Sequence, residues 1–273
     1  MDTALYYHSM LIAARILGDA TTGSALMERI RRIPIAELLD GSGRVIHGIK
    51  DDGSRLAGVW EDWGGETALV LLLQRLVQGD AAAPKMKSDG KVWQGTGFIP
   101  EIQSLLFPGF DAPRKDRVSG QDWAAARDAE LGRQRGYFAE LRGPLAGSGL
   151  YGLSAGEGRR GIGYLVSGTD LPKQEIIHPH YVLMSACLHP DTAAMLAMLE
   201  RLEKSGVFPP WGLVENVDTI NGEMLPMVGS LNASFEALAS YHLLSKHRHE
   251  PDIIYRAAND HPELAAALRL FYP

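Results

Sequence analysis

Apolar residues recur along this chain mostly at helical spacing, and that pattern predicts a succession of amphipathic helices. The first segment spans residues 2–17 and should stop at Gly18. A second helix is expected from a cap at Thr21 or Thr22 to about Ile33, because Ser and Thr are favoured helix caps.

Further helices are predicted over residues 65–77, 98–107, 121–141, 180–188, 191–205, 231–247, 252–258 and 262–270. Between them, residues 39–60 carry the turn signals GSG and DDG, which predict a loop or a small hairpin. The glycine-rich residues 143–170 are expected to be irregular. About ten helices and almost no strand indicate an all-α fold. We expect helical hairpins stacked around a common axis, with long Gly-rich loops at one end carrying the function.

Composition narrows the function classes. The 273 residues are 45% hydrophobic and 22% charged, which is typical of a globular chain, and we expect one domain over residues 1–273. The net charge is −6 and no basic stripe is present, which argues against a nucleic-acid partner. No apolar run approaches the ~20 residues of a membrane span. The N-terminus lacks the features of a signal peptide, and the sequence leaves a cytoplasmic and an exported location open.

Metal and nucleophile chemistry have little support in the sequence. The histidine pairs His178/His180 and His247/His249 lack the spacing of a helical zinc pair, so we expect no metal and no cofactor. The single cysteine, Cys187, lies in an apolar context and should be a buried thiol. GLSAG matches the letters of a nucleophile elbow, but the residues after it do not look helical, which disfavours an α/β-hydrolase.

The stretch VWEDWGGE, residues 59–66, is the strongest candidate for chemistry. It places Trp60 and Trp63 beside Glu61, Asp62 and Glu66, directly before a long apolar run. Flat rings beside carboxylates are typical of a sugar site. An apolar neighbourhood also raises the pKa of a carboxyl group, as a general acid requires. The alternative is a surface glutamate that complements the helix dipole.

Acids also recur with aromatic residues or glycines in other segments. Glu101 lies in GFIPEIQSLLF, Tyr151 and Glu157 lie in YGLSAGEG, and Trp211 and Glu215 lie in WGLVENVD. Each acid alone is more often a structural or solvated carboxylate. Together with the 59–66 stretch they favour a carbohydrate site.

Several segments together resemble the glycoamylase-like family, which includes bacterial endo-β-1,2-glucanases with an (α/α)6 toroid fold. The likeness runs nearly from end to end, and its order and spacing are more specific than any one motif. It is carried by MDTALYYHSMLIAARI, WGGETALVLLLQRLVQG, GFIPEIQSLLFPGFDAPRKD, YGLSAGEG, HPHYVLMSACLHPDTAAMLAMLERLEKSG, WGLVENVD and MLPMVGSLNASFEALASYHLL.

The resemblance implies a glycoside hydrolase acting on a glucan or related oligosaccharide. Glu66 matches the general-acid position, and Asp2 and Glu215 are the candidates for the second catalytic carboxylate. Glu157 and Glu215 stand where the family tends to have aspartate, which puts a β-1,2-glucan substrate in question.

The resemblance also implies how a sugar would be held and how the ring would close. The expected sugar-contacting residues are Trp60, Glu61, Asp62, Trp63, Glu101, Tyr151, Glu157 and Trp211. With about ten helices in place of twelve, the toroid should be incomplete, closed by an oligomer partner or by N-terminal helices missing here. The alternative function is a non-catalytic carbohydrate-binding or scaffold protein on the same helices.

Overall fold

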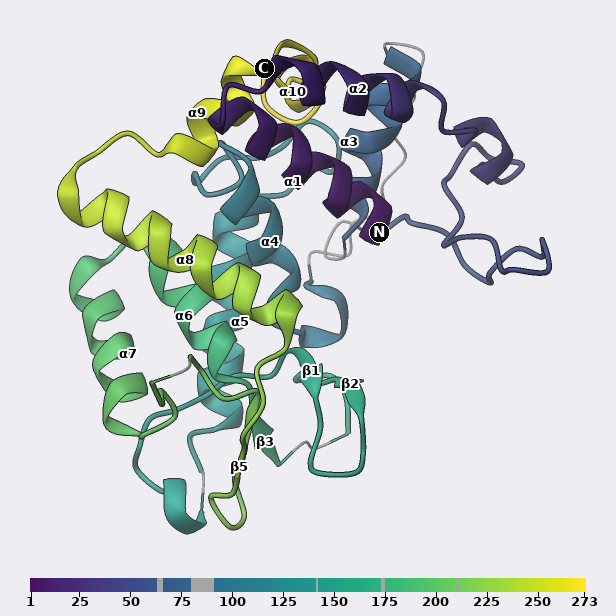
Figure 1. The fold of residues 1–273 in the computed structure, drawn as a ribbon. Coiled ribbons are helices and arrows are strands. Elements are labelled where there is room, and N and C mark those ends of the chain that lie inside the picture. The colour runs from purple at the N-terminus through teal and green to yellow at the C-terminus, as the bar shows by residue number, and fades with distance from the viewer. Residues whose placement is uncertain (63–65, 80–90, 141, 173–174, 211) are drawn as a thin grey trace. The chain divides into compact units, whose positions relative to one another are not determined.

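A computed structural model describes residues 1–62, 66–79, 91–140, 142–172, 175–210 and 212–273. Ten α-helices and five short β-strands lie within these ranges (Figure 1). Chain contacts divide the protein into two compact units. The first unit comprises residues 1–90, 106–123 and 251–273, and the second comprises residues 91–105 and 124–250. The expectation of one domain over the whole chain stays a prediction.

The first unit is built from helices alone among its described elements. These are α1 (Asp2–Ile16), α2 (Ala20–Arg31), the 3-10 helix η1 (Ile35–Leu38), α3 (Thr67–Gln78), α9 (Ile253–Asp260) and α10 (Pro262–Leu268). Helix α1 packs against α2, α3 and α9, and α10 packs against α3 and α9. The predicted helical segments of this unit are therefore confirmed, with ends that differ by a few residues.

Local chemistry explains where these helices begin and end. Helix α2 is capped by Asp19, whose carboxylate accepts the Thr22 N–H at 2.9 Å, so the predicted cap at Thr21 or Thr22 is wrong. Helix α3 buries most of its length because it is a nearly unbroken apolar run. It ends at Gly79, whose φ of +59° favours glycine. Residues 39–60 form a loop held by isolated antiparallel bridges, among them that of Leu39 with Val45.

The second unit combines helices with short strands. Its elements are η3 (Trp93–Gly95), α4 (Ile99–Leu106), α5 (Trp123–Tyr137), η4 (Gly143–Leu145), β1 (Ala155–Glu157), β2 (Tyr164–Val166), β3 (Ile176–Ile177), α6 (Pro179–Leu188), α7 (Thr192–Lys204), β4 (Asn216–Asp218), β5 (Met224–Leu225) and α8 (Ser230–Arg248). Helix α6 is buried along its whole length and packs against α7 and α8. No helix in the described ranges has the length and apolar character needed to cross a bilayer.

The strands correct one expectation from the sequence. Within residues 143–170, β1 and β2 form an antiparallel hairpin in which Ala155 pairs with Val166. Strands β3, β4 and β5 form a second antiparallel sheet, in that order. Each strand is only two or three residues long, which is too short for a clear alternation of apolar and polar residues.

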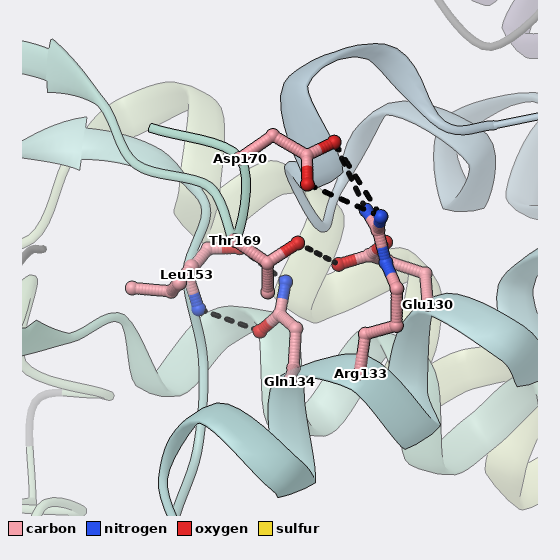
Figure 2. A network of polar contacts seen from close by, with 6 residues as sticks. All are labelled: Glu130, Arg133, Gln134, Leu153, Thr169 and Asp170. Atoms are coloured by element: carbon pink, nitrogen blue, oxygen red, sulfur yellow. Dashed lines mark hydrogen bonds and ion pairs between the residues drawn. The ribbon is translucent and has the colours of Figure 1, made fainter. Parts of the chain in front are cut away.

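Helix α5 holds the loops that lead into these sheets (Figure 2). The Gln134 side chain accepts the Leu153 N–H at 2.6 Å and donates to the Leu153 carbonyl at 2.8 Å. The preceding residue, Arg133, pairs with Glu130 at 2.6 Å and with Asp170 at 3.2 Å. Two loop segments are thereby fixed to one helix, one through a buried amide and the other through an exposed ion pair.

Candidate functional site

Glu66 lies at the start of α3 in the first unit, at its N-cap position and one residue before the first helical turn. Its side chain makes no cap hydrogen bond. Burial raises the pKa of the Glu66 carboxyl to about 7, the Met1 ammonium group opposes this rise, and the Asp2 charge adds to it. A carboxyl group with a pKa of about 7 is about half protonated at pH 7, and a general acid needs this protonated fraction.

The other predicted acids of the first unit have different surroundings. Asp2 begins α1 and is exposed to solvent. Glu61 is ion-paired with Arg44, which also pairs with Asp40 at 2.8 Å. Asp62 is exposed. Among these acids, Asp2 is the one whose charge acts on Glu66.

The tryptophans of the 59–66 stretch divide into one that is described and one that is not. Trp60 packs against the cluster of Ile35, Val45 and Val70, and its ring centroid lies 4.6 Å from that of His47. The backbone N–H of Trp60 donates to the Val45 carbonyl at 2.8 Å. Trp63 lies outside the described residues. Trp60 therefore contributes to the packing of the 39–60 loop as well as being a predicted sugar contact.

Glu215 forms the centre of a separate group of polar contacts in the second unit. Its carboxylate accepts the Glu157 N–H at 3.1 Å, the Gly229 N–H at 2.9 Å and the Asn232 Nδ2–H at 2.7 Å. These donors come from β1, from the residue before α8 and from α8 itself. The side chain is 3% exposed, so its charge is held by fixed donors in place of water. We call Glu215 and its three donor groups the Glu215 centre.

Two glycines leave the room that this centre needs. A Cβ at Gly156 would lie 2.7 Å from Oε1 of Glu215 and 2.8 Å from Nδ1 of His178. A Cβ at Gly229 would lie 2.9 Å from Oε2 of Glu215. Both distances are far below van der Waals contact, so a side chain at either position would displace the carboxylate.

The backbone around the centre is fixed by the small sheet. Val217 of β4 pairs with Ile177 of β3, and this register places residue 178 opposite residue 216, next to Glu215. His178 Nδ1 donates to the Glu215 carbonyl at 3.2 Å. The Asn216 side chain donates to the Glu157 carbonyl at 2.6 Å, which links β4 to the end of β1. Hydrogen bonds to His178 and to the Glu157 carbonyl therefore hold the backbone around Glu215 in place.

Glu236 of α8 is an acid that the sequence analysis missed. It is half-buried, and burial first and the Glu215 charge second raise the pKa of the Glu236 carboxyl to about 7. Glu236 lies four residues after Asn232, hence on the same face of α8. The available signal was weak: a single acid in the small and apolar run SLNASFEALAS.

The other predicted residues of the second unit lie deeper. Glu101 is fully buried on α4, and neither carboxyl oxygen has a hydrogen-bond partner in the described part of the chain. Tyr151 is 1% exposed, with its hydroxyl 2.6 Å from Sδ of Met198. Glu157 is half-buried and contributes its backbone N–H to the Glu215 centre. Trp211 lies outside the described residues.

Burial also argues against two competing chemistries, a serine nucleophile at Ser154 and a reactive thiol at Cys187. Ser154 Oγ lies 2.9 Å from Nε2 of His180, but both residues are buried and Ser154 precedes a strand, so GLSAG is no strand-to-helix elbow. Cys187 is fully buried as predicted, and burial raises the pKa of its thiol to about 12. Within the described ranges, no three His, Cys, Asp or Glu side chains are grouped as metal ligands would be.

A hollow of about 290 Å³ in the first unit lies apart from this chemistry. It is bordered by α1, α2 and the start of α10, and Arg15, Met27 and His261 are among its lining residues. None of the predicted site residues lines it. The case for a site therefore rests on the carboxyl groups and their surroundings.

Comparison with solved structures identifies the class of fold. The chain has the helical fold of glucoamylase-like and β-1,2-glucanase proteins, which confirms the resemblance drawn from the sequence at the level of the fold. Whether the helices close a toroid stays a prediction. No family model and no curated protein matches the sequence.

Three solved structures represent this likeness. A putative glucoamylase from Bacteroides uniformis matches with a TM-score of 0.72 and 15% identity, over 98% of this chain and 70% of that chain. The β-1,2-glucanase from Parabacteroides distasonis matches with a TM-score of 0.68 and 13% identity, over 98% of this chain and 44% of its own. The endo-β-1,2-glucanase from Chitinophaga pinensis matches with a TM-score of 0.67 and 12% identity, over 97% of this chain and 69% of that chain.

Proposed function

We propose that the protein is a glycoside hydrolase that cleaves a glucan or a related oligosaccharide, with Glu66 as its general acid. The observation that carries the proposal is the half-buried Glu66 carboxyl, whose pKa burial raises to about 7. The fold shared with glycoside hydrolases supports the same reaction class. Fold alone does not fix function, so the role of Glu66 is the part to be tested.

The reaction needs two carboxyl groups with opposite tasks. Glu66 gives its proton to the glycosidic oxygen as the bond from that oxygen to the anomeric carbon breaks. A water molecule attacks the anomeric carbon, and its proton passes to a carboxylate. The products are two shorter sugars, one with a new reducing end, and the sum of the step is the addition of one water.

Two carboxylates are candidates for the base, and each meets a different requirement. Asp2 is exposed and its charge acts on Glu66, so it has contact with water. Glu215 is buried and its charge is fixed by three donors, which gives a preorganised carboxylate with little contact with water. Both remain in the proposal, and the kinetics of Asp2→Asn and Glu215→Gln separate them.

The first substrates to test follow from the structural neighbours. Two of them are β-1,2-glucanases, and the Chitinophaga pinensis structure contains sophorotriose and glucose. A β-1,2-glucan and sophorotriose are therefore the first probes. Other linkages belong in the panel because Glu157 and Glu215 are each one methylene longer than the aspartate that the resemblance leads us to expect.

The test compares three proteins on a panel of glucans by the appearance of new reducing ends. Wild type should cleave at least one glucan, and Glu66→Gln should lose about 10²–10⁴-fold in rate with its fold unchanged. Glu37→Gln is the matched control, since Glu37 is an exposed glutamate of the same unit. A fully active Glu66→Gln variant would remove Glu66 from the role. Binding without any cleavage would favour the carbohydrate-binding alternative.

A further inference from the structure

The hollow of about 290 Å³ in the first unit has no part in the proposed hydrolysis. It lies between α1, α2 and the first residues of α10, and α1 packs directly against α2. Its floor is apolar, because Leu11, Ala14 and Met27 line it and none of them is more than 5% exposed. The hollow therefore offers room and buried apolar surface to the body of a small organic molecule.

The acids that line this hollow already have partners within the chain. Asp19 is held as the cap of α2. Glu263 pairs with Arg31 at 3.3 Å, and Glu28 lies 3.8 Å from Arg32. The polar character that remains for a ligand is therefore set by the other groups of the hollow.

Arg15 is the cation of the hollow that lacks such a partner. It stands in the last turn of α1, and its side chain makes no hydrogen bond or ion pair within the described residues. Its charge complements the helix dipole, but that interaction leaves the N–H groups of the guanidinium open. Arg15 also lines a neighbouring hollow of about 330 Å³, to which α9 contributes Arg256 and Asp260. Two arginines and one acid meet there, so the charge around Arg15 is positive.

A second donor comes from His261, which is 9% exposed and lines the same hollow as Arg15. Its Nδ1 accepts the Leu264 N–H at 3.4 Å and so caps α10. Burial lowers the pKa of His261, the Glu263 charge opposes this and the Arg15 charge adds to it. The neutral ring therefore carries its proton on Nε2. That N–H has no partner in the described part of the chain.

We propose that this hollow is a binding site for a small organic carboxylate. The carboxylate accepts hydrogen bonds from the Arg15 guanidinium and from Nε2–H of His261, and the apolar body of the ligand lies on Leu11 and Met27. A guanidinium group suits a carboxylate because it can donate two parallel N–H bonds. A bare inorganic anion would leave the apolar floor unused. The inference is independent of the proposed hydrolysis, since no residue assigned to that reaction lines the hollow.

A binding experiment on the whole chain compares four probes by calorimetry at pH 7. Benzoate and hexanoate join a carboxylate to an apolar body, benzyl alcohol has the ring without the charge, and inorganic phosphate has charge without the apolar body. The two carboxylates should bind saturably, and the other two at least tenfold more weakly. Absence of carboxylate binding overturns the inference, and so does binding of benzyl alcohol or phosphate as tight as that of benzoate.

Variants locate the bound benzoate. Arg15→Gln should weaken binding tenfold or more, because the charge is lost. Ser24→Trp should abolish it, since position 24 lines the hollow from the exposed side of α2 and the indole would fill the space. Arg29→Gln is the matched control, at an exposed arginine of α2 outside the hollow, and should bind as wild type does. Circular dichroism checks that each variant is folded. Unchanged binding in both Arg15→Gln and Ser24→Trp overturns the inference.

The imidazole of His261 gives a readout inside the hollow. Its NMR signal, identified by its loss in His261→Asn, should titrate below the ordinary value of 6.5 in the free protein. Saturating benzoate should raise that pKa, because a nearby negative charge favours the imidazolium ion. The asparagine variant keeps a cap for α10 but loses the Nε2 donor, so it should bind benzoate several-fold more weakly. A His261 pKa that benzoate leaves unchanged overturns the assignment of His261 to the site.

Discussion

Glu66 in the first unit and Glu215 in the second are the same residue type in two different settings. Glu66 is half-buried at the start of a helix and makes no cap hydrogen bond, and burial raises its pKa to about 7. Glu215 is almost fully buried but accepts three N–H groups. The difference lies in the hydrogen-bond donors: the Glu66 side chain makes no cap hydrogen bond, whereas three N–H groups hold both oxygens of Glu215 in place.

The largest predicted difference between Glu66 and Glu215 is in how much each side chain contributes to the free energy of unfolding. Glu215→Ala should lower the free energy of unfolding by about 3 kcal/mol or more, because it leaves three buried N–H groups without an acceptor. Glu66→Ala should change it by about 1 kcal/mol or less, since that side chain has no cap hydrogen bond to lose. Urea unfolding at pH 7 measures both. Equal losses in the two variants would contradict the contrast.

The second effect concerns pH and uses Glu101, a fully buried carboxyl without hydrogen-bond partners in the described part of the chain. Burial raises its pKa from 4.5 to about 7, against the field of Arg127. Its contribution to stability is therefore fully present below pH 4.5 and is lost as the pH rises through 7. The total loss is on the order of 3 kcal/mol.

The glutamine variant isolates this contribution. Glu101→Gln cannot ionise, so its unfolding free energy should fall less between pH 4.5 and pH 8 than that of wild type. Urea unfolding at several pH values gives both curves. A variant with the wild-type slope would show that Glu101 does not hold its proton in the folded protein.

The smallest predicted effect tests how tightly the Glu215 centre is packed. Gly156→Ala should cost about 1–3 kcal/mol of stability, because the new Cβ would lie 2.7 Å from the Glu215 carboxylate. Gly132→Ala, on the exposed face of α5 with open space around it, should be neutral or stabilise by up to about 1 kcal/mol. Thermal unfolding of the pair tests this. A harmless Gly156→Ala would mean that the centre can shift.

Helices could be predicted from the sequence because their signals are local. The apolar run after Glu66 and the glycine at its end suffice to place α3 within about two residues. The β1–β2 hairpin could not be found in this way, since Ala-Gly-Glu has no strand pattern and gains its partner only through the fold. The cap of α2 was missed for a simpler reason: Asp19 stands directly before the helix and is as good a cap as the two threonines after it.

The candidate site was predictable only where an acid stands beside a conspicuous neighbour. Glu66 and Glu215 were found through adjacent glycines or tryptophans. Glu236 was not, because its significance comes from a residue 21 positions earlier that the fold brings beside it. Tyr151 shows the opposite case: its sequence context indicates a sugar contact, and the structure buries its ring. A local sequence motif does not indicate how deeply a residue is buried in the fold.

The Gln134 side chain does for residue 153 what a neighbouring strand would do. By bonding to both the N–H and the carbonyl of Leu153, it anchors a buried loop whose carbonyls at Leu153 and Ser154 also accept the backbone N–H groups of Gly97 and Ser167. Exchange of the Leu153 amide hydrogen with solvent is thereby linked to the opening of a helix that it does not belong to. Helix α5 therefore helps to hold the loop that leads to Glu157 in one conformation.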